Sequence, residues 1–245
     1  MTALDGWEGG RTIAQGAEAV LEVGEFLGRP AVLKLRRVKG YRHPDLERSI
    51  RVSRTRAEAR ALRDAREAGV RTPVVMDIDP EAGRLVLERV EGPTLRWALD
   101  GLPGPDRERA GRALGAVLGA LHAAGMVHGD PTTSNFILER MEDEVEGVKA
   151  GLPGLAVLDI SMGGRADGVE ERGVDLRLLS EAFVSTHHIH GDLFRVVLEG
   201  YREAFPEGAE GSIDRMDAIA ARGRYIARKG RTAGVHDGGD GDGPK

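Results

Sequence analysis

The most constraining feature of the sequence is the polar segment at residues 128–135, HGDPTTSN, which lies between two apolar segments. Before it, residues 105–124 carry apolar side chains at helical spacing, and Gly125 supplies a helix end. After it, residues 136–138 have the composition of a short strand. The segment is therefore predicted to be a loop that joins a helix to a strand.

Two side chains in this loop have the spacing that phosphoryl transfer requires. In the H-x-D-x-x-x-x-N loop of kinases, the Asp accepts the hydroxyl proton of the acceptor and the Asn holds a metal ion on the ATP phosphates. Asp130 and Asn135 are therefore the candidate catalytic and metal-binding residues. The alternative is that both are ordinary turn residues around Pro131.

Length and composition set wide limits on the fold. A chain of 245 residues, 40% hydrophobic and 31% charged, is long enough for one large domain or two lobes. Its net charge of −5 gives no general case for nucleic-acid binding, and the absence of cysteine excludes disulfides and thiolate metal sites. No apolar run reaches membrane-spanning length and no secretion signal begins the chain, so a cytoplasmic protein is expected.

Residues 19–23 and 31–35 alternate as strands and predict a hairpin. Lys34 has apolar neighbours, and a buried ammonium needs an anionic partner, although a strand-edge Lys that reaches solvent also fits the sequence. The turn before the hairpin has small residues that let backbone N–H groups approach an anion. This candidate phosphate-binding turn consists of Gly16, Ala17, Glu18 and Ala19.

Residues 51–68 are rich in Arg, Ala and Glu and predict a helix. Glu58 lies near the small apolar face of this helix, which makes it the candidate partner of Lys34 for positioning the ATP α- and β-phosphates. The alternative is a surface ion pair between Glu58 and Arg54, one turn earlier.

Two further strands are predicted at residues 74–78 and 85–90, and the Glu-Gly-Pro sequence at 91–93 breaks the pattern. Strands precede this break and helices follow it, so it is the expected hinge. The backbone edge from Glu88 to Val90 suits an adenine ring.

Residues 155–158 predict a buried strand that ends at Asp159. A carboxylate at a strand end beside Asn135 suits Mg²⁺, which takes one or two protein carboxylates and completes its shell with phosphate oxygens and water. The alternative is an Asp that caps the next turn.

The rest of the chain predicts helices with apolar faces that belong to the core. These positions are Leu176, Leu179, Phe183 and Val184, then Phe194, Val197, Leu198, Tyr201 and Phe205. His187, His188 and His190 are a weak metal candidate because no acidic partner is evident near them. The chain after Asp159 is too short for a long activation segment and the full helical lobe of an ordinary protein kinase.

The order of these motifs resembles the small atypical kinase of the KEOPS complex, the archaeal and eukaryotic assembly that makes threonylcarbamoyladenosine in tRNA. The resemblance spans residues 16–228. Its most specific motifs are KGYRHP at 39–44, Arg54-Thr55 before Glu58, HGDPTTSN at 128–135, STH at 185–187 and RGR at 222–224. The TTSN ending separates this family from aminoglycoside-type phosphotransferases, which share HGD.

The resemblance implies an α+β, two-lobed, protein-kinase-like fold. A small β-rich lobe is expected at 1–90, a reduced helical lobe without a long activation segment at 91–230, and a disordered tail at 231–245. The resemblance assigns Lys34 and Glu58 to phosphate positioning, Asp130 to catalysis, and Asn135 with Asp159 to the metal. ATP and Mg²⁺ are the implied cofactors.

The implied function is that of an ATP-dependent atypical protein kinase or ATPase that supports N6-threonylcarbamoyladenosine modification of tRNA. The implied partners are the KEOPS threonylcarbamoyltransferase subunit, expected as a separate chain, the other subunits and, through the complex, tRNA. A non-catalytic nucleotide-binding scaffold of the same complex and a free-standing small-molecule phosphotransferase are the alternatives.

The sequence departs from the family pattern in two places. Asp159 is followed by Ile160 and Ser161 where the family has Phe-Gly. Ile can replace Phe as an apolar plug, but Ser takes a positive φ less readily than Gly. The stretch before Arg228 is less basic than is usual in the family, which weakens its expected role toward tRNA.

Overall fold

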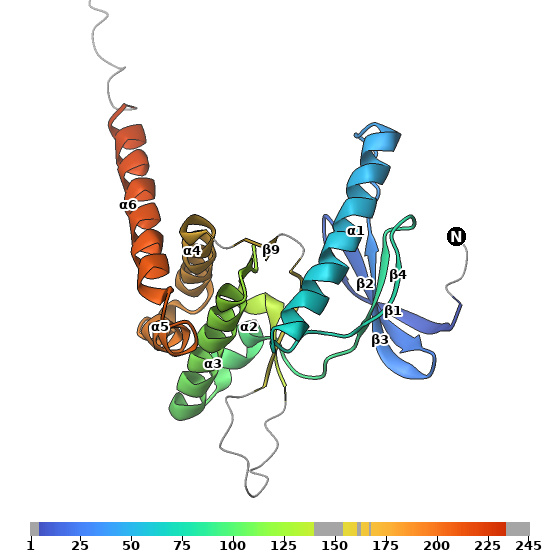
Figure 1. The fold of residues 1–245 in the computed structure, drawn as a ribbon, viewed down its shortest axis with the longest axis horizontal. Coiled ribbons are helices and arrows are strands. Elements are labelled where there is room, and N and C mark those ends of the chain that lie inside the picture. Colours follow the sequence, from blue (N-terminus) through green and yellow to red (C-terminus); the bar gives the residue numbers. More distant parts are fainter. Residues whose placement is uncertain (1–4, 140–153, 161–162, 167, 234–245) are drawn as a thin grey trace, which may run out of the picture.

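The computed structural model describes residues 5–139, 154–160, 163–166 and 168–233, with side chains as far as Arg222. Figure 1 shows a sheet crossed by one long helix, α1, beside a part built mainly of helices. The chain therefore has the predicted α+β composition, with a strand-rich N-terminal part and a helical C-terminal part.

The N-terminal part is a five-stranded antiparallel sheet in the order β1-β2-β3-β5-β4. Its strands are β1 (Trp7–Gln15), β2 (Ala19–Phe26), β3 (Arg29–Arg36), β4 (Val75–Asp79) and β5 (Arg84–Glu88). The predicted hairpin is confirmed by β2 and β3, while β5 ends two residues before the predicted limit at Val90. The buried Leu62 and Ala65 of α1 share one core cluster with Leu85 and Leu87 of β5.

Helix α1 (Pro44–Glu67) begins seven residues before the predicted start at Arg51, so that prediction was wrong. Pro44 occupies the first turn, where a missing backbone N–H removes no helical hydrogen bond. Glu47 is buried in the same turn and accepts a hydrogen bond from Arg42 at 3.1 Å. The irregular loop after β3 therefore ends at His43, and Arg42 helps to fix the start of the helix.

The predicted hinge connects β5 to α2 (Leu95–Ala98), the first helix of the C-terminal part. At Gly92 the backbone φ is 140°, and a Cβ there would lie 2.2 Å from the carbonyl oxygen of Leu138. Only glycine fits this close approach. The hinge is held to the helical part by a hydrogen bond from Leu138 N to Pro93 O at 2.9 Å.

The C-terminal part continues with helices and short strands. The helices are η1 (Leu99–Gly101), α3 (Gly104–Ala123), η2 (Thr133–Asn135), α4 (Val169–Thr186), η3 (His188–His190), α5 (Leu193–Ala204) and α6 (Ala209–Ala233). The strands are β6 (Met126–Val127) with β9 (Gly164–Arg165), and β7 (Phe136–Leu138) with β8 (Leu155–Val157). The predicted helix–loop–strand unit is thus α3, the loop containing η2, and β7.

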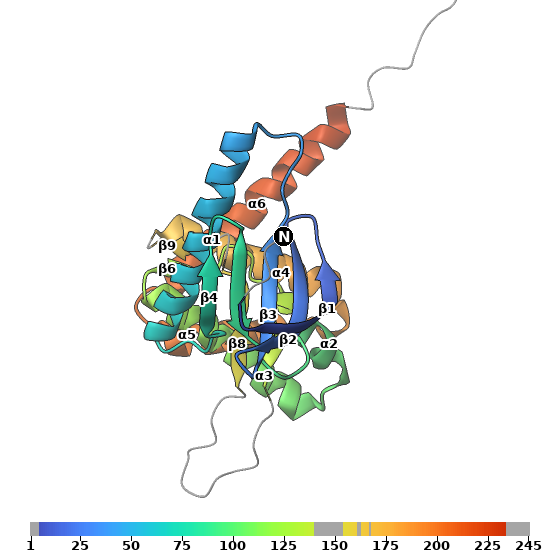
Figure 2. The same ribbon diagram turned by 90° about the vertical axis from the view of Figure 1, so that its right-hand side faces the viewer.

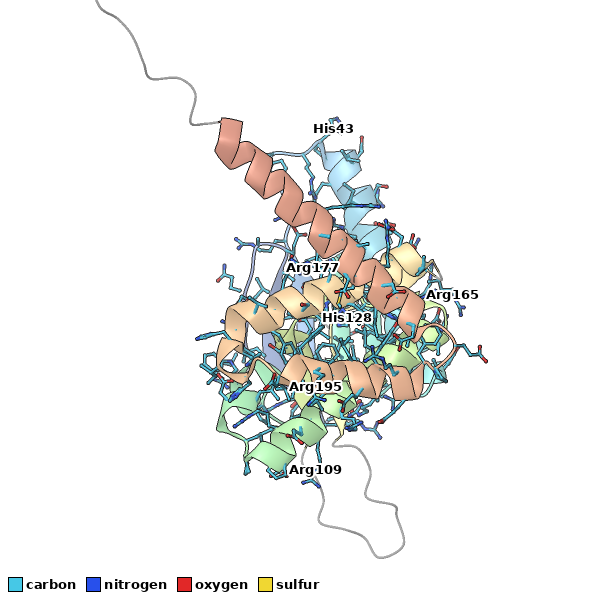
Figure 3. All side chains as sticks on the ribbon, turned by 90° about the vertical axis from the view of Figure 1, so that its left-hand side faces the viewer. His43, Arg109, His128, Arg165, Arg177 and Arg195 are labelled. Carbon is cyan, nitrogen blue, oxygen red and sulfur yellow. The ribbon has the colours of Figure 1, made fainter. Side chains whose placement is uncertain are left out.

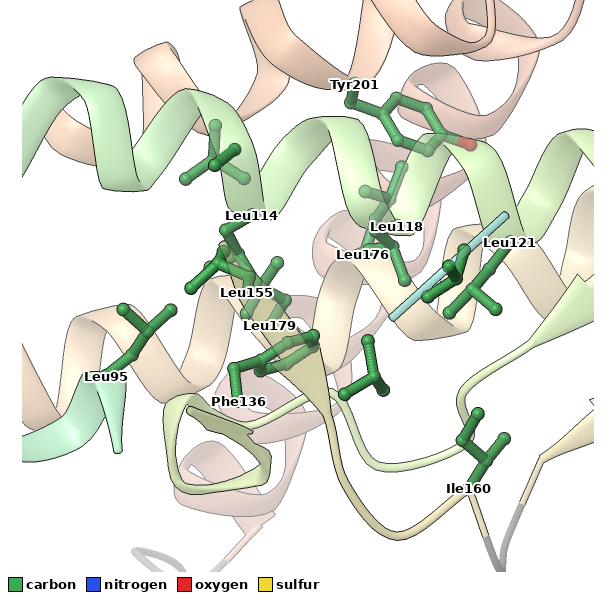
Figure 4. Packing of buried hydrophobic residues seen from close by; sticks show 14 of the residues in the cluster. Leu95, Leu114, Leu118, Leu121, Phe136, Leu155, Ile160, Leu176, Leu179 and Tyr201 are labelled. Atoms are coloured by element: carbon green, nitrogen blue, oxygen red, sulfur yellow. The ribbon is translucent and has the colours of Figure 1, made fainter. Parts of the chain in front are cut away.

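The core of the helical part lies between α3, α4 and α5, and Figure 4 shows its leucines beside Phe136 and Tyr201. Val197 and Tyr201 of α5 are fully buried, as predicted. Val184 is 72% exposed, so its assignment to the core was wrong. Its neighbour Phe183 points inward, and adjacent residues of a helix lie on different faces.

Helix α6 reaches Ala233 and so includes residues 231–233 of the tail that the sequence predicts to be disordered. α6 packs beside α4, and Figures 1 and 2 show its C-terminal end extending beyond the other helices of the C-terminal part. The predicted tail from 234 to 245 lies outside the described residues.

The close packing of α3 on α5 makes Gly115 a sensitive position. A Cβ at Gly115 would lie 1.8 Å from the carbonyl oxygen of Val197, so Gly115→Ala must push the two helices apart. We expect a loss of about 1–3 kcal/mol in the free energy of unfolding, measured by urea denaturation. Gly104→Ala, where a Cβ would meet nothing within 4 Å, is the control and should not destabilise the protein. Equal stability of the two variants would contradict this account.

Candidate functional site

Lys34 lies between two carboxylates that come from distant parts of the chain. Its Nζ is 2.6 Å from Glu58 Oε1 on α1 and 2.9 Å from Asp159 Oδ2, just after β8. Lys34 and Glu58 are buried, whereas the Asp159 side chain is 41% exposed. These contacts bring the strand-rich part and the helical part together at one point.

Glu58 has a second cationic partner, Arg36, which the sequence analysis missed. Lys34 and Arg36 are two residues apart on β3, so both side chains leave the same face of the sheet. The two-residue spacing of Lys34 and Arg36 in a predicted strand was the sequence signal that could have identified Arg36. The alternative pair of Glu58 with Arg54 does not form, because Arg54 binds Glu18 at 2.9 Å.

Asp130 and Asn135 contact each other across the predicted loop. The Asn135 side-chain amide donates to the Asp130 backbone oxygen at 2.8 Å and to Asp130 Oδ2 at 3.2 Å. The backbone N–H of Leu158 donates to Asn135 O at 2.8 Å, which places Asp159 immediately beside this loop. Lys34, Asp130, Asn135 and Asp159 are therefore connected through short contacts.

Asp159 has a backbone φ of +42°, in the left-handed region that non-glycine residues rarely adopt. Such conformations are costly and gather at functional sites. The next residue, Ile160, is buried in the core, where an apolar plug was expected. Ser161, which was expected to take a positive φ less readily than Gly, lies outside the described residues.

The donor set at this point fits Mg²⁺. Asn135 turns its amide nitrogen to Asp130, which directs the amide oxygen the other way, and Asp159 adds a partly exposed carboxylate. Amide and carboxylate oxygens are the protein ligands that Mg²⁺ prefers. Among the described residues no group of three His, Cys, Asp or Glu side chains has the arrangement of a metal site, so the weak His187 candidate gains no support.

The candidate catalytic loop is held by Asp175, a buried residue of α4 that the sequence pattern did not reveal. The Asp175 carboxylate accepts hydrogen bonds from the backbone N–H of His128 at 2.6 Å and of Gly129 at 2.8 Å. These two residues directly precede Asp130. Figure 3 labels His128 within the molecule, and its side chain is fully buried. An Asp beside Leu176 on the buried face of an apolar helix was the sequence signal.

Asp175 also anchors a buried chain of polar groups. His122 Nε2 lies 3.2 Å from Asp175 Oδ2, and His122 Nδ1 lies 2.8 Å from the Tyr201 hydroxyl. Burial raises the pKa of Tyr201 to about 12, so the hydroxyl keeps its proton and donates to Nδ1. Burial also lowers the pKa of His122, although Asp175 opposes this effect, so neutral His122 donates its Nε2–H to Asp175.

The candidate phosphate-binding turn, Gly16 to Ala19, connects β1 to β2. Gly16 N donates to Ala19 O at 2.9 Å, which closes the turn. Lys39, from the loop after β3, donates to Ala17 O and lies 3.5 Å from Glu18. The turn is thus fastened to the loop that precedes α1.

The candidate adenine edge lies at the hinge, and the Glu88 side chain there is already engaged. Arg71 binds Glu88 through two hydrogen bonds of 2.8 and 2.9 Å, which lowers the Glu88 pKa, and also binds Glu139 at 2.9 Å. Val90 is buried. The Glu88 side chain and the backbone N–H groups of Glu88 and Arg89, which donate to Val74 O and Pro30 O, already have partners, and contact of an adenine ring with the backbone of residues 88–90 stays a prediction.

Comparison with known proteins decides the family. Over 226 aligned residues the chain is 39% identical to the KEOPS complex subunit Bud32 of Pyrococcus abyssi, and the alignment covers 89% of this chain and 97% of that protein. The chain belongs to the Bud32 family. The predicted family is thereby confirmed.

Other Bud32-like sequences form part of longer proteins. The chain is 38% identical over 214 residues to the probable bifunctional tRNA threonylcarbamoyladenosine biosynthesis protein of Methanothermobacter thermautotrophicus. That alignment covers 87% of this chain but 36% of the bifunctional protein. The chain thus spans about a third of the length of such relatives. No protein-family model matches it.

The kinase-like fold is confirmed by a solved structure, the Rio2 kinase–ADP/Mg²⁺–phosphoaspartate complex from Chaetomium thermophilum. The TM-score is 0.59 at 16% identity, covering 89% of this chain and 71% of that one. At this identity the likeness shows the fold alone. In the part of the Bud32-family chain that the structure describes, no helix has the length and apolarity needed to cross a membrane.

The buried imidazoles predict loss of stability in mild acid. Burial lowers the pKa of His122 and His128 from the ordinary 6.5, so below that pH the unfolded chain binds protons that the folded chain excludes. The contribution of these two histidines to the free energy of unfolding is fully present above pH 6.5. It is lost as the pH falls from 6.5 toward their lower pKa values in the folded state. Carboxylates with lowered pKa values titrate below 4.5 and lie outside this window.

Urea unfolding at about pH 7.5 and about pH 5.5 measures this effect. His122→Gln should reduce the difference between the two free energies of unfolding. His43→Gln is the control, because the His43 side chain is 73% exposed. Wild-type stability that is the same at both pH values would contradict the account.

Proposed function

We propose that this chain is an ATP-dependent phosphotransferase or ATPase that acts in a KEOPS-type complex and supports N6-threonylcarbamoyladenosine formation in tRNA. The observation that carries the proposal is the placement of Lys34 between Glu58 and Asp159, beside the hydrogen-bonded pair of Asp130 and Asn135. This arrangement brings together a cation for the phosphates, Lys34, and a candidate base, Asp130. It also brings together two candidate oxygen ligands for a divalent cation, Asn135 and Asp159.

Each residue is assigned a distinct role. Arg36 binds one oxygen of the Glu58 carboxylate, and the other oxygen holds the Lys34 ammonium in place. Lys34 is thereby positioned to bind the α- and β-phosphates of ATP. Asn135 and Asp159 would hold Mg²⁺. Bound Mg²⁺ would neutralise negative charge on the phosphates and so stabilise the charge of the transition state.

Asp130 is the proposed proton acceptor. Its Oδ2 receives a hydrogen bond from the Asn135 amide, which leaves Oδ1 to orient an incoming hydroxyl group or water and take its proton. The exposed position of Asp130 allows an acceptor to approach. Asp175 fixes the two preceding backbone N–H groups and thereby aims Asp130.

Nucleotide contacts are proposed at two further places. Backbone N–H groups of Gly16, Ala17, Glu18 and Ala19 would approach the phosphates, and the backbone at Glu88 and Val90 would contact the adenine ring. The names of the relatives support a KEOPS setting, with the threonylcarbamoyltransferase, the other subunits and tRNA as proposed partners. The cytoplasm is the proposed location.

Removing the proposed base tests catalysis. Asp130→Ala should lower the rate of phosphate release from ATP about 10²- to 10⁴-fold, because the proton acceptor is lost, while the Kd for ATP stays within about twofold. Asp106→Ala, which removes an exposed carboxylate paired with Arg109 on α3, is the control and should keep the wild-type rate. Undiminished release by Asp130→Ala would favour the non-catalytic scaffold.

The contact of Lys39 with the phosphate-binding turn suggests how a partner could act on the site. We also propose that the 39–44 loop, which lies between the strand with Lys34 and the helix with Glu58, couples an external partner to the nucleotide pocket. Arg42 is a poor probe for this coupling, because its removal leaves the buried Glu47 without a cation. Lys39 is the better probe, since its partner Glu18 is mostly exposed and the pair contributes little to stability.

Lys39→Ala should change the free energy of unfolding by about 1 kcal/mol or less and leave basal ATP binding intact. It should abolish the stimulation of ATP turnover by the transferase partner or by tRNA. Arg48→Ala, which removes an exposed pair with Glu81, is the control and should keep the stimulation. Full stimulation of the Lys39→Ala variant would rule out the coupling.

A further inference from the structure

His187 connects a surface carboxylate to the catalytic loop. It directly follows α4 and is buried, with its ring packed against Phe183 at a centroid distance of 5.5 Å. Its Nδ1 lies 2.9 Å from Asp100 Oδ1 in η1, and its Nε2 lies 3.0 Å from Thr133 Oγ1 in η2. Three elements far apart in sequence therefore meet through one imidazole.

The chemistry of the three groups fixes the direction of both hydrogen bonds. An ionised carboxylate only accepts, so His187 Nδ1–H donates to Asp100. In the neutral ring Nε2 then carries the lone pair and accepts a hydrogen bond from the Thr133 hydroxyl group. Asp100 thus selects the tautomer that can hold Thr133. This acidic partner cannot be recognised from the local sequence, because Asp100 and His187 are 87 positions apart.

A hydroxyl, an imidazole and a carboxylate in a row also occur in hydrolases with an activated nucleophile. Here Thr133 is only 2% exposed, so no substrate carbonyl can reach its hydroxyl group. The neighbouring hydrogen bonds point to a different use. Thr133 begins η2, which ends at Asn135, and Asn135 N donates to Thr132 O at 2.9 Å.

We propose that His187, oriented by Asp100, is a positioning residue for the catalytic loop. By holding Thr133 it fixes η2 and therefore the direction of the Asn135 amide that contacts Asp130. Asp175 holds the start of the loop through backbone groups, and His187 holds its end through a side chain. The consequence for turnover rests on the proposed function, whereas the effect on loop rigidity does not.

Hydrogen exchange tests the rigidity without any activity measurement. Thr133→Val removes the hydroxyl group at nearly constant volume, and Thr133→Ser keeps it. In Thr133→Val, amides of residues 132–138 should exchange about five- to tenfold faster relative to those of α3, as expected for the loss of one net hydrogen bond. Thr133→Ser and His188→Gln, an exposed neighbour of His187, should exchange like the wild type. Unchanged exchange in Thr133→Val would overturn the proposal.

Steady-state kinetics tests the link to catalysis. Thr133→Val and His187→Gln should each lower kcat for ATP turnover about tenfold, with KM for ATP within about twofold, since the loop and not the nucleotide contact is disturbed. The double variant should be no slower than the slower single variant, because both changes remove one interaction. Wild-type kcat in both single variants would overturn the positioning role. A wild-type protein without turnover would refute the proposed function instead, and exchange would still decide the rigidity.

Discussion

The structure depends first on the buried ammonium of Lys34. Transfer of such a charge from water into a protein interior costs several kcal/mol unless it is paired, so its position fixes where carboxylates must lie. Glu58 supplies one carboxylate from α1 and Asp159 supplies the other from the segment after β8. The sheet, the long helix and the helical part therefore meet at Lys34, which gives the site its shape.

The helical part has its own polar anchor. Asp175 lies on the buried face of α4 and is satisfied by two backbone N–H groups and His122. Because a buried carboxylate that loses its donors is costly, the loop before Asp130 has little freedom to move away. The apolar packing of α3, α4 and α5 thus supports the candidate catalytic loop indirectly, by keeping the Asp175 carboxylate against it.

The sequence was informative where chemistry imposes fixed local spacing. Asp130 and Asn135 were predictable from the loop motif, and Lys34 from a cation in an apolar strand. Asp175, and the pairing of Asp100 with His187, were not found because they join residues whose proximity arises only from packing between helices. The early start of α1 was missed for a local reason, since Pro44 suits both a loop and the first turn of a helix.

Under the proposed function the wild-type chain turns over ATP, and a partner accelerates this reaction. The most direct measurement is the time course of phosphate release from γ-labelled ATP with Mg²⁺, by the chain alone and with the threonylcarbamoyltransferase partner. The account predicts slow release by the chain alone and faster release with the partner. Tight binding of ATP and Mg²⁺ with no release under either condition would contradict it and would identify a nucleotide-binding scaffold.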